Sequence, residues 1–497
     1  MNEHYLNIPF DDDRPLQEQI LERMVSAILE GQLPVDAPLP SSRKLAAQLK
    51  VSRNTVILVY EKMVDAGYLQ PSNRRGYFIA PAFHNPDQIN VQPKQPVADH
   101  SPEWSARFKR LPSQDRSIVK PNQWRNFEYP FIYGQIQQEY FPIEHWRDCA
   151  RRTLSTTGIT DWLHDRVDTD DPMLVEQLRT RLLPKRGIYA EPEEILVTIG
   201  TQNSLYLLAN LLFDRSTCVA LENPGFRDAH SIFGSFSNNL VLQPVDHEGI
   251  VVDERLESCD YIYVTPSHQV PTGAEMSRAR RSELMELARR ADTVLIEDDY
   301  DAEINMQDNP IPALKSEDRD KRIIYVGSLS KSMSPGLRIG FMVADEQLIA
   351  EARALRRLMY RHPATNNQRQ TALFLALGYY DSYLRKLRTL YSTKLDRMNR
   401  ALNEYLPHML TSDVSRGASS FWLRAPEGVD TEQLSWAAAR DSVLIESGAV
   451  HFLSPSPPSN YLRLGFSAIP AHKIDPGIAQ LRNTLERFLG SQLPLVP

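Results

Sequence analysis

Hydrophobic positions in the first eighty residues recur at helical spacing in three segments. Pro15 can open the first helix and Gly31 can close it. Its apolar positions are Leu16, Ile20, Met24, Ala27 and Ile28. The second segment, 41–49, and the third, from Arg53 to about Ala66, each begin at serine caps. A short helix, a tight turn and a longer helix predict a helix-turn-helix.

Two short alternating segments follow this pattern. Residues 68–70 and 76–79 alternate as strands do, and the turn between them, 71–75, contains proline and asparagine. This arrangement predicts a two-stranded wing. We therefore expect a small α+β winged helix-turn-helix domain over residues 1–80.

From about residue 126 to residue 497, short apolar runs alternate with helical patterns. The predicted strands are Ile195–Ile199, Cys218–Leu221, Asn239–Leu242, Tyr261–Val264, Thr293–Ile296, Ile323–Val326 and Gly340–Val343. Such alternation is typical of an α/β domain with a mostly parallel sheet. In these sheets ligands gather at the carboxyl ends of the strands, so candidate site residues are sought there.

A proline-rich stretch separates the two predicted domains. Residues 81–125 contain seven prolines and no glycine. This composition favours a semi-extended linker over a flexible coil. The predicted organisation is thus a domain at 1–80, a linker at 81–125 and a domain at 126–497.

Composition adds an asymmetry of charge to this picture. The chain has 497 residues and a net charge of −7, yet residues 41–80 carry seven basic side chains against two acidic ones, a local net of +5. Three dispersed cysteines favour a reducing compartment, and the sequence shows neither a signal peptide nor an apolar run long enough for a membrane span. A cytoplasmic protein is expected.

The basic residues coincide with the parts of a helix-turn-helix that face DNA. The first turn of the third helix presents Ser52, Arg53, Asn54 and Thr55, which suit base edges and phosphates in a major groove. Arg74 and Arg75 occupy the tip of the wing, where arginines can enter a minor groove. The alternative is a small protein-interaction domain with a solvated basic face, which does not predict this coincidence.

This region closely resembles the winged helix-turn-helix of the GntR family. The matching stretches are LPSSRKLAAQLKVSRNTVILVYEKMVDAGYL and GYFIA. The resemblance implies DNA contacts by Arg43, Arg53 and Thr55, with Gly76 in the wing. It also implies that two copies of the chain bind a repeated or palindromic operator in double-stranded DNA.

The most informative strand end in the large domain carries a lysine. The apolar run 323–326 leads into Gly327-Ser328-Leu329-Ser330-Lys331, and Arg338 follows shortly after. A single lysine is most often a solvated surface cation. A partly buried one can form a Schiff base with the aldehyde of pyridoxal phosphate (PLP). Ser328, Ser330 and Arg338 supply the hydroxyls and guanidinium that bind a phosphate.

Three other strand ends offer contacts for the same cofactor. Gly200, Thr201 and Gln202 open a helix whose N-terminus can hold a phosphate. Phe226 can stack on a planar ring, although a lone Phe is more often part of a core. His268, beside Gln269 on a rigid loop, can donate a hydrogen bond to a ligand oxygen or can be satisfied within its turn.

The run Glu297-Asp298-Asp299-Tyr300-Asp301 places four acids at one strand end. A metal site is disfavoured because no histidine lies nearby and a phenol interrupts the acids. One aspartate, Asp298, can instead pair with a protonated pyridine nitrogen. Tyr300 can then donate to the phenolate oxygen of the ring. We expect no metal.

The order of these segments resembles that of fold-type I aminotransferases. The stretch Asn460–Phe466 is similar to the family segment whose arginine grips the substrate carboxylate, which implies an effector-binding role for Arg463. Aminotransferases of this fold carry asparagine before Pro-Thr-Gly, whereas this chain has Val270. The combination resembles the MocR/GabR-type regulators, which fuse a GntR winged helix to an aminotransferase-like domain. This resemblance implies PLP and a head-to-tail, domain-swapped homodimer.

Three functions are compatible with these features. The first is a transcriptional regulator that senses a small amine or amino acid through aldimine exchange at Lys331. The second is an active PLP-dependent aminotransferase with an accessory DNA-binding domain. The third is a cofactor-free structural domain. The first is favoured because an enzyme has no use for Arg53 or Arg74.

Overall fold

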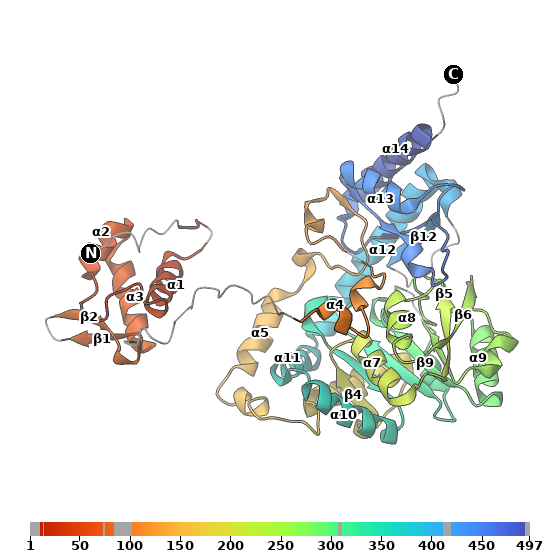
Figure 1. The fold of residues 1–497 in the computed structure, drawn as a ribbon, viewed down its shortest axis with the longest axis horizontal. Helices are drawn as coiled ribbons and strands as arrows, with labels where there is room; N and C mark the ends of the chain where they lie inside the picture. The colour runs from red at the N-terminus through yellow and green to blue at the C-terminus, as the bar shows by residue number, and fades with distance from the viewer. Residues whose placement is uncertain are drawn as a thin grey trace. The chain divides into compact units, whose positions relative to one another are not determined.

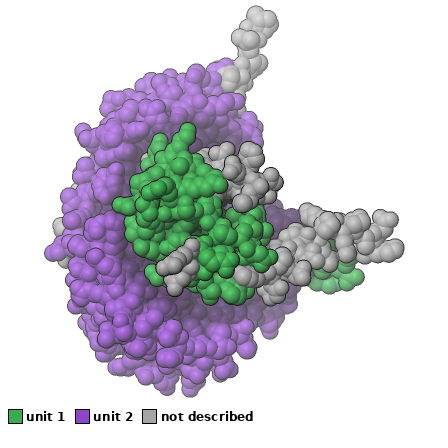
Figure 2. Space-filling view, turned by 90° about the vertical axis from the view of Figure 1, so that its left-hand side faces the viewer, with its two compact units in different colours: residues 1–110 green, residues 111–497 purple. Residues whose placement is uncertain are grey.

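The computed structural model divides the chain into two compact units, Met1–Arg110 and Leu111–Pro497. Figure 2 shows each unit in its own colour. The structure describes residues 10–12, 14–72, 75–83, 102–118, 120–306, 311–410 and 419–492. The boundary falls within the predicted linker, so the described residues from Leu111 onward belong to the large unit. No helix in the described part of the chain is long and apolar enough to cross a bilayer.

The described part of the first unit contains helices and a two-stranded hairpin. Their bounds are α1 Leu16–Leu29, α2 Ser42–Leu49, α3 Arg53–Asp65, β1 Leu69–Ser72 and β2 Gly76–Ile79, and a short helix α4, Trp104–Arg107, follows. Ser41 caps α2 by accepting from the Lys44 N–H, and Lys50 adopts a left-handed conformation that turns the chain toward α3. This is the predicted helix-turn-helix.

The core of the first unit joins α1, α2 and α3 to the hairpin. Its buried members include Ile20, Met24, Leu45, Val56, Val59, Tyr60, Met63, Leu69 and Ile79. The antiparallel register pairs Leu69 with Ile79, so one face of the hairpin packs inward. The Tyr60 hydroxyl also donates to the Pro40 carbonyl oxygen at 2.7 Å, which fixes the chain before α2 against α3.

The large unit is built on an eight-stranded, mostly parallel sheet with the order β4-β11-β10-β9-β8-β5-β6-β7. Its strands are β4 Ile195–Thr198, β5 Cys218–Asn223, β6 Asn239–Asp246, β7 Gly249–Ile250, β8 Tyr261–Val264, β9 Val294–Asp299, β10 Ile323–Ser328 and β11 Gly340–Val343. The pairs β5–β6, β5–β8, β8–β9 and β9–β10 are parallel. The predicted strands therefore form, and β9 and β10 extend further than expected, to Asp299 and Ser328.

Helices cover both faces of this sheet. They are α5 Ile143–Thr153, α6 Pro172–Gln177, α7 Thr201–Leu212, α8 Arg227–Phe233, α9 Arg278–Arg290, α10 Glu346–Tyr360, α11 Thr365–Ala376 and α12 Tyr379–Tyr405. Alternate strand residues face opposite layers. Leu196 and Ile296 pack with residues of α7, α8 and α10, whereas Leu295 and Ile323 pack with residues of α9. This is the α/β class that the sequence predicts.

The C-terminal elements gather at one end of the large unit (Figure 1). They are β12 Ser420–Arg424, α13 Thr431–Arg440, β13 Val443–Leu444, β14 Glu446–Ser447, β15 Tyr461–Gly465 and α14 Ile474–Gln492. The order β12-β15-β14 makes a small antiparallel sheet. The strand β3, Tyr129–Pro130, pairs with β13 and brings the start of the large unit to this end.

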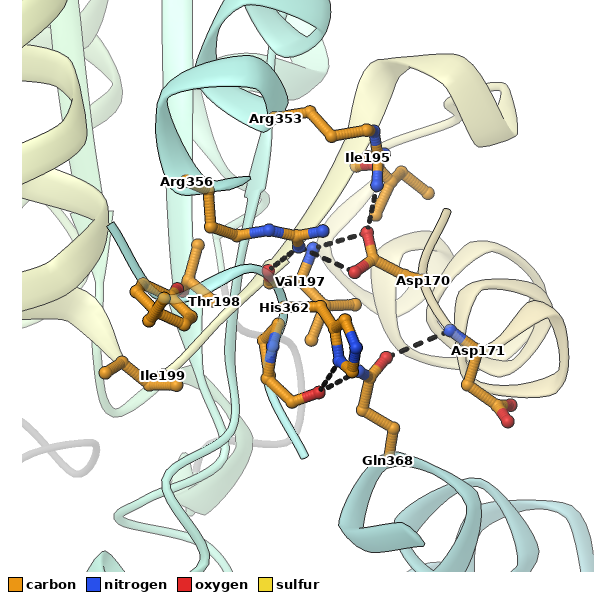
Figure 3. A network of polar contacts seen from close by, with 12 residues as sticks. Asp170, Asp171, Ile195, Val197, Thr198, Ile199, Arg353, Arg356, His362 and Gln368 are labelled. Carbon is orange, nitrogen blue, oxygen red and sulfur yellow. Dashed lines mark hydrogen bonds and ion pairs between the residues drawn. The ribbon is translucent and has the colours of Figure 1, made fainter. Parts of the chain in front are cut away.

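A buried ion network ties helices of the large unit to the edge strand β4 (Figure 3). Arg353 and Arg356 of α10 contact the two carboxylate oxygens of Asp170 at 2.7 and 2.6 Å. The Val197 N–H donates to the same carboxylate, and Arg356 donates to the Val197 carbonyl oxygen. Asp170 and Arg356 are inaccessible, so each charge depends on the other for compensation.

Candidate functional site

Ten of the sequence-predicted residues of the large unit line one cavity of about 330 Å³. They are Thr201, Gln202, Phe226, Asp298, Tyr300, Ser328, Ser330, Lys331, Arg338 and Arg463. A larger surface groove of about 1040 Å³, around Arg166 and Glu346, contains none of them. The cavity lies at the carboxyl ends of β9 and β10, where a parallel sheet places its ligands.

Lys331 lies within this cavity, next to the ring of Tyr133. Its Nζ is 4.2 Å from the ring centroid. Gly134, at a φ of +70°, passes so close that a side chain there would collide with Lys331 Nζ. Burial and, second to it, the nearby Lys120 together lower the pKa of Lys331 to about 7, against the opposing charge of Asp301. A substantial fraction of the amine is therefore neutral and nucleophilic near neutral pH.

Asp298 faces the same cavity with one carboxylate oxygen lacking a partner. The Tyr263 hydroxyl donates to Oδ2 at 2.7 Å, while Oδ1 is buried and has no hydrogen-bond partner among the described residues. Burial raises the pKa of Asp298 to about 7. A buried carboxylate with a missing partner fits a cationic donor such as a protonated pyridine nitrogen.

The same cavity offers groups for a phosphate. Helix α7 begins at Thr201 directly after Gly200, whose φ of +116° suits glycine. A side chain at Gly200 would come within 2.8 Å of the Arg338 guanidinium. Ser330 Oγ is buried and has no partner in the described structure, whereas Ser328 Oγ accepts from the Ser330 N–H. Helix N–H groups, a hydroxyl and a guanidinium thus converge.

Aromatic and apolar side chains also line the cavity. They are Phe226, Val270 and Tyr300, and such side chains suit the faces of a planar ring. The Tyr300 hydroxyl donates to the His268 carbonyl oxygen at 2.9 Å. That bond holds the phenol at the cavity wall.

The structure does not bring the His268 side chain to this cavity. The imidazole is buried elsewhere, near the charges of Asp299, Arg186 and Arg281, and both ring nitrogens lack hydrogen-bond partners among the described residues. Burial lowers the pKa of His268 to about 4, so the ring stays neutral. His268 is not among the residues that line the cavity, and its carbonyl oxygen accepts from Tyr300, so the expected bond from its side chain to a cofactor oxygen stays a prediction.

The acids flanking Asp298 have partners of their own. Asp299 forms an ion pair with Arg186 at 2.7 Å, and Glu297 accepts backbone N–H groups from Leu314 and Lys315. Asp301 accepts from the Ser419 hydroxyl at 2.9 Å. In the described residues, no three His, Cys, Asp or Glu side chains are grouped to hold a metal ion.

Arg463 marks the end of the cavity assigned to the effector. Its guanidinium pairs with Glu446 at 2.5 Å and lies 4.4 Å from the Tyr133 ring centroid. Its Nε is buried and has no partner within the described chain. Burial alone would raise the pKa of Glu446, but Arg463 and His451 lower it to about 2. Glu446 is therefore ionised and holds Arg463 in place.

Sequence reasoning missed four residues of this end: Lys120, Tyr133, Gly134 and Glu446. Glu446 pairs with Arg463 in the register of β14 and β15, and no local sequence motif predicts this pairing. Tyr133 and Gly134 are positioned because the Phe131 carbonyl oxygen accepts from the N–H of Gly465, the last residue of β15. The one available signal was the apolar run Phe131-Ile132-Tyr133 ending at a glycine.

The second candidate site is the exposed start of α3. Arg53 and Asn54 are exposed, and Arg43 on α2 is exposed as well. The Ser52 hydroxyl accepts from the Thr55 N–H at 3.1 Å and also contacts the Thr55 hydroxyl, so both side chains partly serve the helix cap. Arg53 Nε donates to the Ser42 hydroxyl of α2 at 3.5 Å, and both Arg53 and Asn54 stay exposed to solvent.

The described residues at the tip of the wing include Arg75 and Gly76. Gly76 is exposed at a φ of +103°, and the Arg75 guanidinium lies 5.6 Å from the Phe78 ring centroid. That contact directs Arg75 along the hairpin while its charge remains in solvent. Arg74, also expected to contact DNA, lies outside the described residues.

The large unit has the fold of aminotransferases. The profile of the family "Aminotransferase class I and II" matches residues 137–481. Among solved structures, LysN, the α-aminoadipate aminotransferase of Thermus thermophilus complexed with N-(5'-phosphopyridoxyl)-L-leucine, has a TM-score of 0.70 and 26% identity; the match covers 78% of this chain and 99% of that one. Fold and cavity together define a fold-type I aminotransferase-like domain.

The first unit and the whole-chain relatives identify the family. The profile "Bacterial regulatory proteins, gntR family" matches residues 16–79. The HTH-type transcriptional regulator TauR of Rhodobacter capsulatus is 36% identical over 95% of this chain and 96% of its own length. The probable rhizopine catabolism regulatory protein MocR of Rhizobium meliloti is 30% identical over 95% and 94%. The chain belongs to the MocR/GabR-type helix-turn-helix transcriptional regulators.

Proposed function

We propose that the protein is a DNA-binding transcriptional regulator that holds PLP at Lys331 and senses a small amine or amino acid there. The observation that carries this proposal is the pair of orphaned buried atoms in the cavity of Lys331. Asp298 Oδ1 suits the ring nitrogen of PLP, and Ser330 Oγ suits its phosphate. The described residues thus leave the polar groups of the site open where this cofactor needs them.

The cofactor would supply an aldehyde that forms a Schiff base with Lys331 and exchanges it for the amine of an effector. The chain supplies the rest. Asp298 keeps a proton on the ring nitrogen, Phe226 and Val270 enclose the ring, and Arg338 with the N-terminus of α7 holds the phosphate. Arg463 binds an acid group of the effector.

DNA binding would use the exposed face of the first unit. Arg43, Arg53 and Asn54 read or position the operator, and Arg75 contacts it from the wing. We further propose a head-to-tail, domain-swapped homodimer, as the family implies, so that two recognition helices reach two half-sites. An effector then acts through its different affinity for two arrangements of the dimer.

The test is a titration of the purified protein with PLP, followed by absorbance. We expect a visible band that disappears in Lys331→Ala, and binding to promoter DNA beside its own gene that changes when an effector amine is added. Binding should weaken steeply with salt, because Lys and Arg contacts to phosphates release counterions. A colourless protein under saturating PLP, or a flat salt titration, contradicts the proposal.

An active aminotransferase with an accessory DNA-binding domain is the second candidate. The lowered pKa of Lys331, about 7, favours it because such an amine can shuttle a proton during transamination. The rate of turnover distinguishes the two candidate functions. Turnover on the order of 1–10³ per second would establish the enzyme. Spectral changes without sustained turnover support the regulator.

A further inference from the structure

Three cationic side chains surround the ring of Tyr133. From the ring centroid, Lys331 Nζ lies at 4.2 Å, Arg463 Cζ at 4.4 Å and Lys120 Nζ at 5.7 Å. The proposed function assigns roles to Lys331 and Arg463. It leaves Lys120 unassigned, although this residue lines the same cavity.

Lys120 reaches the cavity from the segment that opens the large unit. The described part of this segment, 111–118 and 120, follows directly on the first unit in the sequence. It is held at identifiable points: Arg227 Nε donates to the Arg116 carbonyl oxygen at 3.2 Å, and Ile118 lines the cavity. Lys120 itself donates to the Tyr133 carbonyl oxygen.

Among the described residues, the ammonium of Lys120 has no carboxylate as an ion-pair partner. An ammonium has three donors, and in the described structure Lys120 uses one of them, for the Tyr133 carbonyl. No described carboxylate forms an ion pair with it. Glu446 is near enough to raise the pKa of Lys120, but burial dominates and lowers it, and Glu446 is already paired with Arg463. A desolvated cation without a partner is costly unless a ligand supplies the anion.

The charges at this end of the cavity leave one positive charge in excess. With Lys331 joined to the cofactor, the two cations next to the Tyr133 ring are Lys120 and Arg463, and the carboxylate of Glu446 is already paired with Arg463. Asp301 is occupied by the hydroxyls of Ser419 and Tyr133, and burial raises its pKa to about 7. A ligand with a single acid group balances this set.

We propose that Lys120 determines effector specificity: together with Arg463 it binds the one acid group, a carboxylate or sulfonate, of a small amine whose nitrogen faces Lys331. This inference rests on the proposed function and names the class of effector. It also means that a bound effector restricts the motion of the segment 111–120. The reason is that the acid group of the effector contacts Lys120, which belongs to that segment.

The test compares three amines on the PLP-loaded full-length protein: β-alanine, 2-aminoethanesulfonate and propylamine, which carries no acid group. Their affinities are measured by the change in cofactor absorbance in wild type, Lys120→Ala, Lys120→Arg and the control Lys109→Ala. Lys109 is exposed and does not line the cavity. Hydrogen exchange of the peptide covering 111–120 is measured with and without each amine.

We expect wild type to prefer an acid-bearing amine, and Lys120→Ala to lose about ten- to a hundredfold of that affinity while its weaker affinity for propylamine stays unchanged. Lys120→Arg should restore most of the loss, and Lys109→Ala should behave as wild type. Bound acid-bearing amine should slow exchange in 111–120 for wild type and not for Lys120→Ala. Whichever of the two acids binds tighter tells carboxylate from sulfonate.

Failure of this inference differs from failure of the proposed function. If Lys120→Ala keeps the cofactor band and the full preference for an acid-bearing amine, the role of Lys120 is overturned and the sensor remains. An unchanged exchange rate in 111–120 overturns the fastening of the segment. If wild type never develops a cofactor band, the proposed function itself fails, and this inference with it. A melting temperature close to that of wild type verifies that each variant is folded.

Discussion

The start of α3 and the cavity around Lys331 use cationic side chains in opposite surroundings. Arg53 stands exposed on a capped helix, where its charge is free to meet a polyanion. Lys331 lies among Tyr133, Lys120 and Asp301, where burial lowers its pKa to about 7. The exposed cation keeps its charge in water, whereas the buried one can give up its proton.

These opposite surroundings allow one chain to carry two kinds of recognition. Phosphate contacts in water need permanent charge and tolerate motion, so an exposed turn of helix suffices. Covalent capture of an amine needs a neutral nucleophile, which only a desolvating cavity provides. The following changes test whether the two regions are as separate as this comparison implies.

The largest expected effect comes from Lys331→Ala. The variant should lose the covalent cofactor band and the response of DNA binding to amines, because Lys331 supplies the amine that follows β10 in the cavity. DNA binding without effector should stay within about twofold of wild type, since the α3 contacts are unchanged. Absorbance and fluorescence anisotropy on labelled promoter DNA measure the two outcomes. If DNA binding were lost as well, the cavity and the start of α3 would not be separate sites of recognition.

Removal of Asp170 tests the buried charges of the large unit. Asp170→Ala should destabilise this unit by about 3–5 kcal/mol, because Arg356 is left buried and uncompensated. The transition of the first unit should not move. Denaturant unfolding followed by circular dichroism resolves this, and Asp320→Ala, which removes an exposed partner of Arg289, should cause no measurable change. Equal effects of the two variants would contradict the role of burial.

The pH dependence of cofactor uptake tests whether burial lowers the pKa of Lys331. Only neutral Lys331 attacks the aldehyde, and its pKa is about 7, so the rate should rise about tenfold per pH unit below pH 7 and level off above it. Lys120→Ala should raise the pKa of Lys331, because a repelling charge is removed while Asp301 and Glu446 remain, and the profile should shift to higher pH. Stopped-flow absorbance gives the rates. A profile that levels off only near pH 10 would show an unshifted lysine.

The smallest effect is expected on the DNA side. Arg53→Ala should cost about 1–3 kcal/mol of discrimination between operator and unrelated DNA if it contacts a guanine. Lys62→Ala removes an exposed charge from the last turn of the same helix and should leave discrimination intact. The cofactor spectrum should be unchanged in both. Competition binding with scrambled DNA is the measurement, and an equal loss for both variants would reduce Arg53 to a general phosphate contact.

Local patterns were sufficient for the elements and for one side of the cavity. The serine caps at Ser41 and Ser52, and the seven apolar strands, follow from propensities that act over a few residues. Lys331 and Asp298 were predicted because parallel strands carry their functional residues at the carboxyl ends. The longer extent of β9 and β10 was missed, since strand ends that carry polar side chains look like loops.

His268 shows what local reasoning leaves open. Its carbonyl oxygen accepts from Tyr300, which lines the cavity, whereas its imidazole is buried near the charges of Asp299, Arg186 and Arg281. The direction of a side chain in an irregular loop depends on the backbone angles of each residue. No pattern of residue types supplies these angles.

The sequence by itself determined the two folds, their order and the lysine at the end of β10, because these depend on local periodicity and on motifs within one strand and turn. Only the tertiary structure decided what surrounds that lysine. The pairing of β3 with β13 and of β14 with β15 brings Tyr133 and Glu446 to Arg463, and the segment at 111–120 adds Lys120. Contacts between residues hundreds of positions apart depend on packing of the whole unit, and one sequence read along its length does not encode them in any local pattern.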